Sequence, residues 1–429
     1  MNLKKILFLL ILGLFCLPIL QYTFNIIEVN PLAGVNPKFK ERPKPTLKSW
    51  FSANFQDSTN LYFDEQIGFK PWLIKLTNQI DYSLLNHTTA PGVVIGKEDY
   101  LYIESYILGY IGQNYIGEEK ISEKVNNLQE ISDFLDKQGV SLIVTFAPGK
   151  ASFLPEYIPN KYDPENPKTS NYNTYSKLLS ESNIRFLDFN DYFKMQKKNF
   201  PYPVYSKVGT HWSSYAKSVV LDSIIHFIEK DRNIDMPDFE FNNINLSDSL
   251  EKVDWDIEEQ MNLLWPLEHI KMPYPNYNFF SYGKNKPNTI VISDSYWWCM
   301  VADRLPNKIF NTDEYWFYFK DRHINNVKQK RDVANTNIKD ELLKQNVILL
   351  MATEATLHMF PYGFDERFNK DIIVAEQYDQ MPFNDKVTYW TNQIKKDPKW
   401  FTSIQAKAKA KGISTEEMLR LDSEFMARK

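Results

Sequence analysis

The sequence predicts an α/β protein built on a mostly parallel sheet with helices on both faces, preceded by one apolar N-terminal helix. The sheet is predicted because helical segments alternate along the chain with short apolar runs rich in β-branched residues. Such runs are typical of strands buried on both faces, and the alternation is typical of parallel sheets. The N-terminal helix is predicted because a long apolar stretch follows two lysines near the start of the chain.

The composition fits a folded protein and argues against several classes of function. The 429 residues are 43% hydrophobic and 15% aromatic, which is enough to bury a large core. The net charge is −4 and no long run of lysine or arginine occurs, so we expect no nucleic-acid partner. Two cysteines, Cys16 and Cys299, and six scattered histidines provide neither a disulfide framework nor a metal-ligand pattern. We therefore expect neither a metal nor a cofactor.

Residues 1–27 have the features of a membrane anchor. Lys4 and Lys5 precede the apolar run 6–20, and a weaker apolar segment extends it. At a rise of about 1.5 Å per residue, this stretch just spans a bilayer core of ~30 Å. Lysines before a membrane span stay on the cytoplasmic side, so the chain after residue 28 is expected in the periplasm or outside the cell. We interpret the segment as a single-pass signal anchor in the cell membrane.

Two other interpretations of this segment were weighed. A cleaved signal peptide also begins with basic residues and a short apolar run, but no A-x-A site directly follows the run here. Lipoprotein processing at Cys16 is disfavoured because the preceding residue, Phe15, is large. The anchor and the cleaved signal peptide both imply that the folded part is exported.

The rest of the chain divides into three parts. Residues 28–49 are predicted to be an extended spacer, because four prolines fix φ and remove backbone donors. Residues 50–396 are predicted to form the main domain. The segment at about 231–283 interrupts the alternation, is rich in Asp, Asn and Pro, and is interpreted as an insertion or lid. Residues 397–429 are predicted to form two amphipathic helices.

Within the main domain, each predicted helix precedes a predicted strand. The clearest helix spans 122–138, with apolar residues at helical spacing and Gly139 suited to the left-handed position after its end. A strand at 140–146 follows it. The other predicted pairs of helix and strand are 172–179 with 184–187, 214–228 with 289–292, and 338–344 with 347–351.

A serine and a histidine are candidates for chemistry. Ser295 follows the predicted strand 289–292, and in parallel sheets ligands bind at the carboxyl ends of the strands. A serine hydroxyl is a weak nucleophile without a neighbouring base. His211 precedes the predicted helix 214–228, and an imidazole titrates near neutrality, so it can take and return the serine proton. Each residue alone is more often a cap, turn or packing residue. The pair is what predicts a Ser-His site.

Four short stretches, read together, resemble the AlgX/AlgJ-like family of SGNH hydrolase-like proteins. They are Gly92–Lys97 with Tyr100–Tyr102, Ala147–Lys150 with Pro155–Pro159, Thr210–Trp212, and Asp294–Tyr296. The histidine block precedes the serine block, the reverse of the order in ordinary SGNH esterases. The resemblance implies an SGNH-like fold and a serine-dependent O-acetyltransferase of the alginate or exopolysaccharide type. It also implies an exported polysaccharide as acceptor and a membrane-bound O-acyltransferase as the acyl donor system.

The chain departs from the family at one position. The family has an aspartate two positions before the histidine, where it orients the imidazole, and this chain has Gly209 there. Three explanations remain open: a Ser-His dyad, a substitute carboxylate, or an inactive site. Glu354 is the substitute that the sequence suggests, because it follows the predicted strand 347–351 at the edge where Ser295 emerges. Its alternative interpretation is a helix cap.

Further roles near the site are expectations with competing structural interpretations. The backbone N–H of Ser295 is a candidate oxyanion donor. Lys150 is a candidate for contact with substrate or oxyanion, and otherwise a solvated turn lysine. Trp212, Tyr296 and Trp297 are candidates for substrate binding, and otherwise core aromatics.

Three functions are consistent with these observations. The first is acyl transfer, most simply of an acetyl group, through an acyl-serine to a glycan hydroxyl. The second is a carbohydrate esterase, in which water replaces the glycan as acceptor. The third is a catalytically silent glycan-binding or assembly protein, which Gly209 keeps open.

Overall fold

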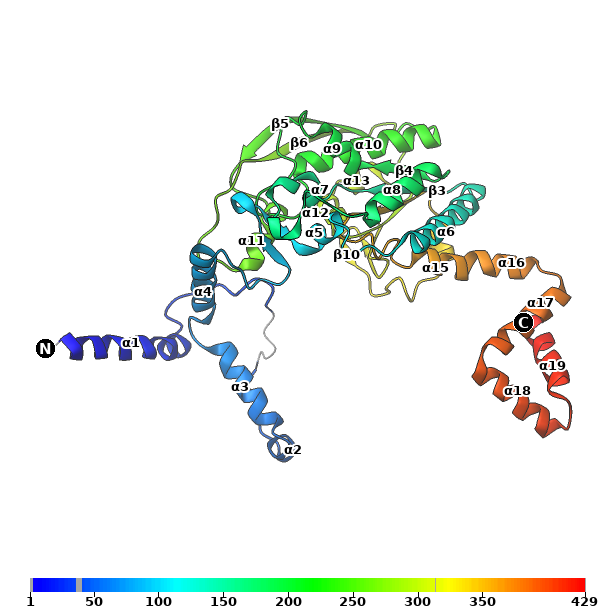
Figure 1. The fold of residues 1–429 in the computed structure, drawn as a ribbon, viewed down its shortest axis with the longest axis horizontal. Coiled ribbons are helices and arrows are strands. Elements are labelled where there is room, and N and C mark those ends of the chain that lie inside the picture. Colours follow the sequence, from blue (N-terminus) through cyan, green and yellow to red (C-terminus); the bar gives the residue numbers. More distant parts are fainter. Residues whose placement is uncertain (1–2, 36–40, 313, 429) are drawn as a thin grey trace.

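A seven-stranded sheet forms the centre of the molecule, which we describe from a computed structural model covering residues 3–35, 41–312 and 314–428 (Figure 1). Positions 36–40 of the predicted spacer therefore lie outside the described residues, as do 1–2 of the predicted anchor and 429 of the C-terminal segment. The order of the strands across the sheet is β10-β9-β8-β7-β11-β3-β4. Five neighbouring strands, β8 to β4 in this order, are parallel, and β9 and β10 continue the sheet in antiparallel fashion. The mostly parallel α/β sheet predicted from the sequence is confirmed.

The ends of the four predicted strands differ from the observed ends by no more than one residue. Three further strands complete the sheet. The strands of this sheet are β3 (Ser141–Phe146), β4 (Arg185–Asp188), β7 (Thr289–Ser293), β8 (Glu314–Phe317), β9 (Asp321–Ile324), β10 (Val327–Lys328) and β11 (Val347–Ala352). Strands β8 to β10 were not predicted, because they are only two to four residues long and mix polar and apolar residues. Their addition places β7, which leads to Ser295, inside the sheet rather than at its edge.

Alternate residues of the central strands enter two separate cores. In β11, for example, Leu349 packs into one core and Leu350 into the other. Helices α6 (Glu118–Lys137), α8 (Asn171–Glu181), α14 (Ile338–Leu342) and α15 (Phe364–Phe368) cover one face. Helices α5 (Glu104–Tyr110), α7 (Lys150–Phe153), α9 (Phe189–Gln196), α10 (Ser214–Arg232), α12 (Trp298–Ala302) and α13 (Pro306–Ile309) cover the other. Helices therefore lie on both faces, as the alternating pattern predicted.

Local signals explain where these helices begin and end. Helix α6 is followed by Gly139 at a φ of 76°, and the N–H of Val140 donates to the carbonyl of Leu135, which closes the helix end. Helix α10 begins after Ser213, whose hydroxyl accepts from the N–H of Ala216 at 3.2 Å. This cap fixes the chain directly after His211.

The segment predicted as an insertion forms a hairpin and one short helix. Strands β5 (Asp238–Ser247) and β6 (Met272–Phe280) pair with each other and pack on α10. Helix α11 (Asp256–Met261) lies between them in the chain and packs against the hairpin of β1 (Val93–Ile95) and β2 (Leu101–Ile103). The insertion is thus a folded part of the domain.

Helices at the two ends of the chain lie outside this sheet and its covering helices, and most of them extend away from the domain (Figure 1). The first four are α1 (Leu3–Phe24), α2 (Leu47–Phe51), α3 (Asn54–Gln66) and α4 (Lys70–Leu85). Helix α1 is long and apolar enough to cross a membrane. The last four are α16 (Val374–Gln380), α17 (Phe383–Lys396), α18 (Pro398–Lys411) and α19 (Thr415–Ala427). Helices α17 to α19 share a small core of their own, so the C-terminal helical part begins before residue 397.

Candidate active site

Ser295 stands in a tight turn directly after β7. The side chain of Asp294 accepts from the N–H of Tyr296 at 3.1 Å and so caps the turn Ser295–Trp297. Its other oxygen accepts from the hydroxyls of Thr353 and Thr356 at 2.7 and 2.8 Å, and from the N–H of Thr353 at 2.9 Å. Asp294 is buried, and these bonds tie the ends of β7 and β11 together. Ser295 is therefore held on a rigid turn and remains partly accessible.

His211 reaches Ser295 from a distant part of the chain. Its Nε2 lies 3.1 Å from the hydroxyl oxygen of Ser295. A bridge between Tyr205 and Trp212, together with the Ser213 cap of α10, fixes the backbone on both sides of the histidine. The imidazole side chain is 15% exposed. The expected juxtaposition of this serine and this histidine is present, in a position open to solvent.

The carboxylate at His211 comes from the inserted segment. Asp256, the first residue of α11, places Oδ2 2.7 Å from Nδ1 of His211. Its Oδ1 accepts from the N–H of Thr210 at 2.8 Å. Two hydrogen bonds thus fix the carboxylate, and it fixes the ring so that Nε2 faces Ser295. This order of serine, imidazole and carboxylate is the geometry of a Ser-His-Asp triad.

Glu354, the carboxylate that the sequence suggested, does not lie at His211. It is buried beside Gly149, and its Oε1 accepts from Nδ2 of Asn190 at 3.1 Å. Burial raises the pKa of Glu354. Strand β11 does carry it to the expected edge of the sheet, but its side chain turns toward α9. The expectation of Glu354 as the third member is therefore corrected in favour of Asp256.

The glycine at the family's aspartate position has a packing reason. A Cβ on Gly209 would lie 2.7 Å from the carbonyl carbon and oxygen of Asp254, closer than atoms can approach without moving. The hydroxyl of Ser206 donates to the same carbonyl and accepts from the N–H of Gly209 at 2.7 Å. The inserted segment therefore occupies the space that a side chain at 209 would need. That contact brings Asp256, two residues later, to the histidine.

Lys150 is part of the frame of the site. Its side chain is 1% exposed, and its ammonium group donates to the carbonyls of Leu101, Lys207 and Gly209 at 2.7, 2.8 and 2.7 Å. These three acceptors use the three N–H bonds of an ammonium group. Desolvation lowers the pKa of Lys150 to about 7, and the charge of Asp256 opposes that shift. The expectation that Lys150 contacts substrate is not met, because the side chain is buried and fully occupied.

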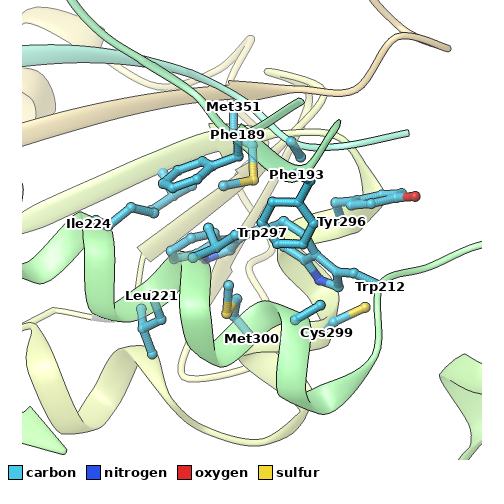
Figure 2. Packing of buried hydrophobic residues seen from close by; sticks show 14 of the residues in the cluster. Phe189, Phe193, Trp212, Leu221, Ile224, Tyr296, Trp297, Cys299, Met300 and Met351 are labelled. Atoms are coloured by element: carbon cyan, nitrogen blue, oxygen red, sulfur yellow. The ribbon is translucent and has the colours of Figure 1, made fainter. Parts of the chain in front are cut away.

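The three aromatic residues expected to bind substrate are core residues. Trp212, Tyr296 and Trp297 are fully buried, so none offers a ring face to a sugar. Figure 2 shows Trp297 packed among side chains of α9 and α10, with Trp212 and Tyr296 beside it. The hydroxyl of Tyr296 donates to the carbonyl of Thr210 at 2.8 Å. These aromatics hold the serine turn against the histidine segment, which is their contribution to the site.

A second acidic group lies beside the triad. Asp254 is buried, and desolvation raises its pKa to about 7, although the hydroxyl of Tyr274 donates to it at 2.7 Å and Lys217 is nearby. Like charges of Glu251 and Asp256 raise the pKa further. The carboxyl of Asp254 accepts from Tyr274, while its backbone contacts Gly209.

Asp256 was missed because the inserted segment gave no periodic pattern. The available signal was Gly209 itself, since it required the carboxylate to come from elsewhere. Between His211 and Ser295 the chain contains Trp255-Asp256-Ile257, an aspartate between apolar residues at the start of a short helix. This aspartate was therefore a second candidate for the carboxylate at His211, besides Glu354.

Comparison with known proteins gives the same family as the residue motifs. Residues 93–248 match the sequence profile of an SGNH hydrolase-like domain of the acetyltransferase AlgX. The match includes His211 and ends before Asp256 and Ser295. Two curated relatives, each named probable alginate O-acetylase AlgJ, come from Pseudomonas syringae pv. tomato and Pseudomonas aeruginosa. They are 23% identical over 163 residues and 24% identical over 178 residues.

These matches are partial. They cover 38% and 41% of this chain and 40% and 43% of the two relatives, so the chain spans about two fifths of the length of each. A solved structure, the O-acetyltransferase domain of Pseudomonas putida AlgJ, superposes with a TM-score of 0.42 at 14% identity. That superposition covers 65% of this chain and 99% of the solved chain. Residues 93–248 of the chain are thus similar to the SGNH hydrolase-like domain of AlgX, and the two curated relatives with partial matches are both named AlgJ.

Proposed function

We propose that this protein is a membrane-anchored O-acetyltransferase that transfers an acetyl group through Ser295 to a hydroxyl of an exported polysaccharide. The observation that carries the proposal is the continuous contact of Ser295, His211 and Asp256, at 3.1 and 2.7 Å. The match to an acetyltransferase profile and the names of the curated relatives favour acetyl transfer among the reactions of such a triad.

In the first step, the hydroxyl oxygen of Ser295 attacks the carbonyl carbon of the acetyl donor. Nε2 of His211 takes the serine proton as the new C–O bond forms. Asp256 holds the Nδ1–H of the ring and stabilises the imidazolium that results. The tetrahedral intermediate collapses, the donor leaves with the proton from His211, and acetyl-Ser295 remains. The backbone N–H of Ser295 is the proposed donor to the oxyanion.

In the second step, a glycan hydroxyl attacks acetyl-Ser295. His211 takes the proton of that hydroxyl and returns it to the oxygen of Ser295 as the ester bond to the enzyme breaks. The product is an acetylated glycan and the free serine. Water in place of the glycan would make the same site an esterase, so the acceptor alone separates the two activities.

The location follows from the proposed anchor. Helix α1 crosses the membrane with Lys4 and Lys5 on the cytoplasmic side, which places the domain in the periplasm or at the cell surface. An acetyl group at that location has to come through the membrane, because cytoplasmic donors do not reach the outside. A membrane-bound O-acyltransferase is the proposed donor system.

The test uses the purified full chain with a soluble acetyl ester and oligosaccharide acceptors. Acetylated oligosaccharide that forms with the wild type and not with Ser295→Ala supports the proposal. Acetate release alone, at a rate that acceptors do not change, would identify an esterase. A fluorophosphonate probe that never labels the wild type, or still labels Ser295→Ala, would contradict a nucleophile at this position.

A further inference from the structure

Helix α4 has one exposed apolar face. Leu73, Leu76, Ile80 and Leu84 recur at steps of three or four residues along α4, and Trp72 precedes Leu76 by four, so the five side chains share one side of the helix. All five are exposed, and the exposed fraction is 51% for Leu73 and 77% for Leu84. A contiguous apolar surface of this kind marks contact with a membrane or a partner.

Two polar side chains of α4, one opposite its apolar face and one beside it, bond to the helix that carries the triad carboxylate and to the segment after that helix. Nδ2 of Asn78 donates to the carbonyl of Met261, the last residue of α11, at 2.9 Å. Oε1 of Gln79 accepts from the N–H of Trp265 at 3.1 Å. Helix α11 begins with Asp256, which bonds to His211. Helix α4 therefore connects its exposed face to the triad through α11.

The exposed face of α4 continues onto α1. The chain turns between α3 and α4 at Gly68, which lies so close to α1 that a Cβ there would be 2.3 Å from the carbonyl oxygen of Pro18. The two helices enclose a corner of about 600 Å³ whose lining residues are all apolar. Its walls include Ile11, Leu14 and Phe15 of α1 and Trp72, Leu73 and Leu76 of α4. In Figure 1, α4 lies between the end of α1 and the central domain.

This continuity identifies the occupant of the corner. When α1 spans a bilayer, Pro18 lies near its outer end, so the corner opens into the outer part of the hydrocarbon layer. Water there would meet only apolar side chains, whereas lipid acyl chains match them. An amphipathic helix with its apolar face toward the acyl chains is stable in the interface, and tryptophan is enriched there.

We propose that α4 lies in the outer membrane–water interface, with its apolar face on lipid acyl chains, and thereby holds α11 and Asp256 at the membrane surface. This rests on the proposed anchoring by α1. The consequence for function is that the triad is held near the bilayer surface, where a membrane-borne acyl donor presents its group.

The test places an environment-sensitive fluorophore, NBD, at one accessible cysteine of the full chain in proteoliposomes, since the second native cysteine, Cys299, is buried. Leu76→Cys and Leu84→Cys report on the apolar face of α4, each in a Cys16→Ser background. Val327→Cys, in the same background, is the matched control, since Val327 is 61% exposed on the edge strand β10. Native Cys16 reports on α1. Retained fluorophosphonate labelling of Ser295 shows that each variant is folded.

The expected result is blue-shifted emission at Leu76 and Leu84 that doxyl-labelled lipids quench to the same extent as at Cys16, with no shift or quenching at Val327. Blue-shifted but unquenched emission at Leu76 and Leu84 would overturn the proposal, because a second copy of the chain would then cover the face. Unshifted emission there would overturn it as well, because water would cover the face. If the emission at Cys16 were itself unquenched, the proposed anchoring by α1 would be wrong. This result distinguishes a failure of the anchor from a failure of the placement of α4.

Discussion

Oδ2 of Asp256 lies 2.7 Å from Nδ1 of His211, across 45 positions of the chain and from within an inserted segment. The contact completes a triad whose third member the family places two residues before the histidine. It makes the insertion part of the candidate site and gives the absence of a carboxylate at Gly209 a structural explanation.

Asp256→Asn is expected to lower the rate of Ser295 acylation by about 10³- to 10⁴-fold, because the amide cannot hold the Nδ1–H tautomer or stabilise the imidazolium. The measurement is the rate of fluorophosphonate labelling, with circular dichroism as the check on folding. Glu354→Gln is the matched control, since it also exchanges a carboxylate for an amide, and it should label at nearly the wild-type rate. The reverse pattern would restore Glu354 as the triad member.

Gly209→Ala is expected to reduce the unfolding free energy by about 1–3 kcal/mol, because the added methyl group overlaps the backbone of Asp254. Displacement of that backbone also moves Asp256, so the labelling rate should fall together with stability. Denaturant unfolding measures the first effect and probe labelling the second. Unchanged values of both would show that the contact between the two segments is looser than described.

Lys150→Met is expected to lower the unfolding free energy by at least about 2 kcal/mol, because the carbonyls of Leu101 and Gly209 lose a buried donor and each unsatisfied group costs about 1–3 kcal/mol. Lys207→Met is the control, because the ammonium group of Lys207 donates to an exposed carbonyl, that of Glu98. Thermal unfolding of the two variants is the measurement. Similar midpoints for both would argue against the structural role assigned to Lys150.

Stability should depend on pH through Asp254, whose pKa in the folded protein is raised from the ordinary value of 3.8 to about 7. Between these values the folded state binds more protons than the unfolded state, so the unfolding free energy falls as the pH rises from about 4 to 7. The group accounts for up to about 4 kcal/mol at about 1.4 kcal/mol per pKa unit.

Denaturant titrations of the wild type and Asp254→Asn across that range measure this dependence. The unfolding free energy of the wild type should fall steadily relative to that of Asp254→Asn from pH 4 to 7. A difference that is constant over the range would mean that Asp254 titrates near its ordinary value.

The parts of the fold predicted from the sequence are those set by local pattern. Helix α6 has apolar residues at helical spacing and a glycine in the left-handed position after it, and β3 and β11 are short runs buried on both faces. Such signals lie within a few residues of one another, so they survive in the folded chain. Strands β8 to β10 lack them, because they are only two to four residues long and mix charged residues with apolar ones.

The residues of the candidate site that were predicted correctly are those that stand in short sequence motifs. Ser295 and His211 stand in recognisable blocks, and their contact follows from the sheet. The roles expected of Trp212 and Trp297 failed because an aromatic residue next to a catalytic one serves core packing equally well, and burial decided the matter. Asp256 depends on a contact between a loop and an insertion, and no local pattern encodes that contact.

The most direct test of the central claim is mass spectrometry of the Ser295 peptide after brief exposure of the full chain to a soluble acetyl donor. The account predicts an added acetyl group on Ser295 that disappears when an oligosaccharide acceptor is supplied, as acetylated oligosaccharide accumulates at the same rate. Asp256→Asn should form this adduct far more slowly, and Ser295→Ala should form none. An acetylated product that forms with Ser295 never modified, or that forms equally well in Ser295→Ala, would contradict it.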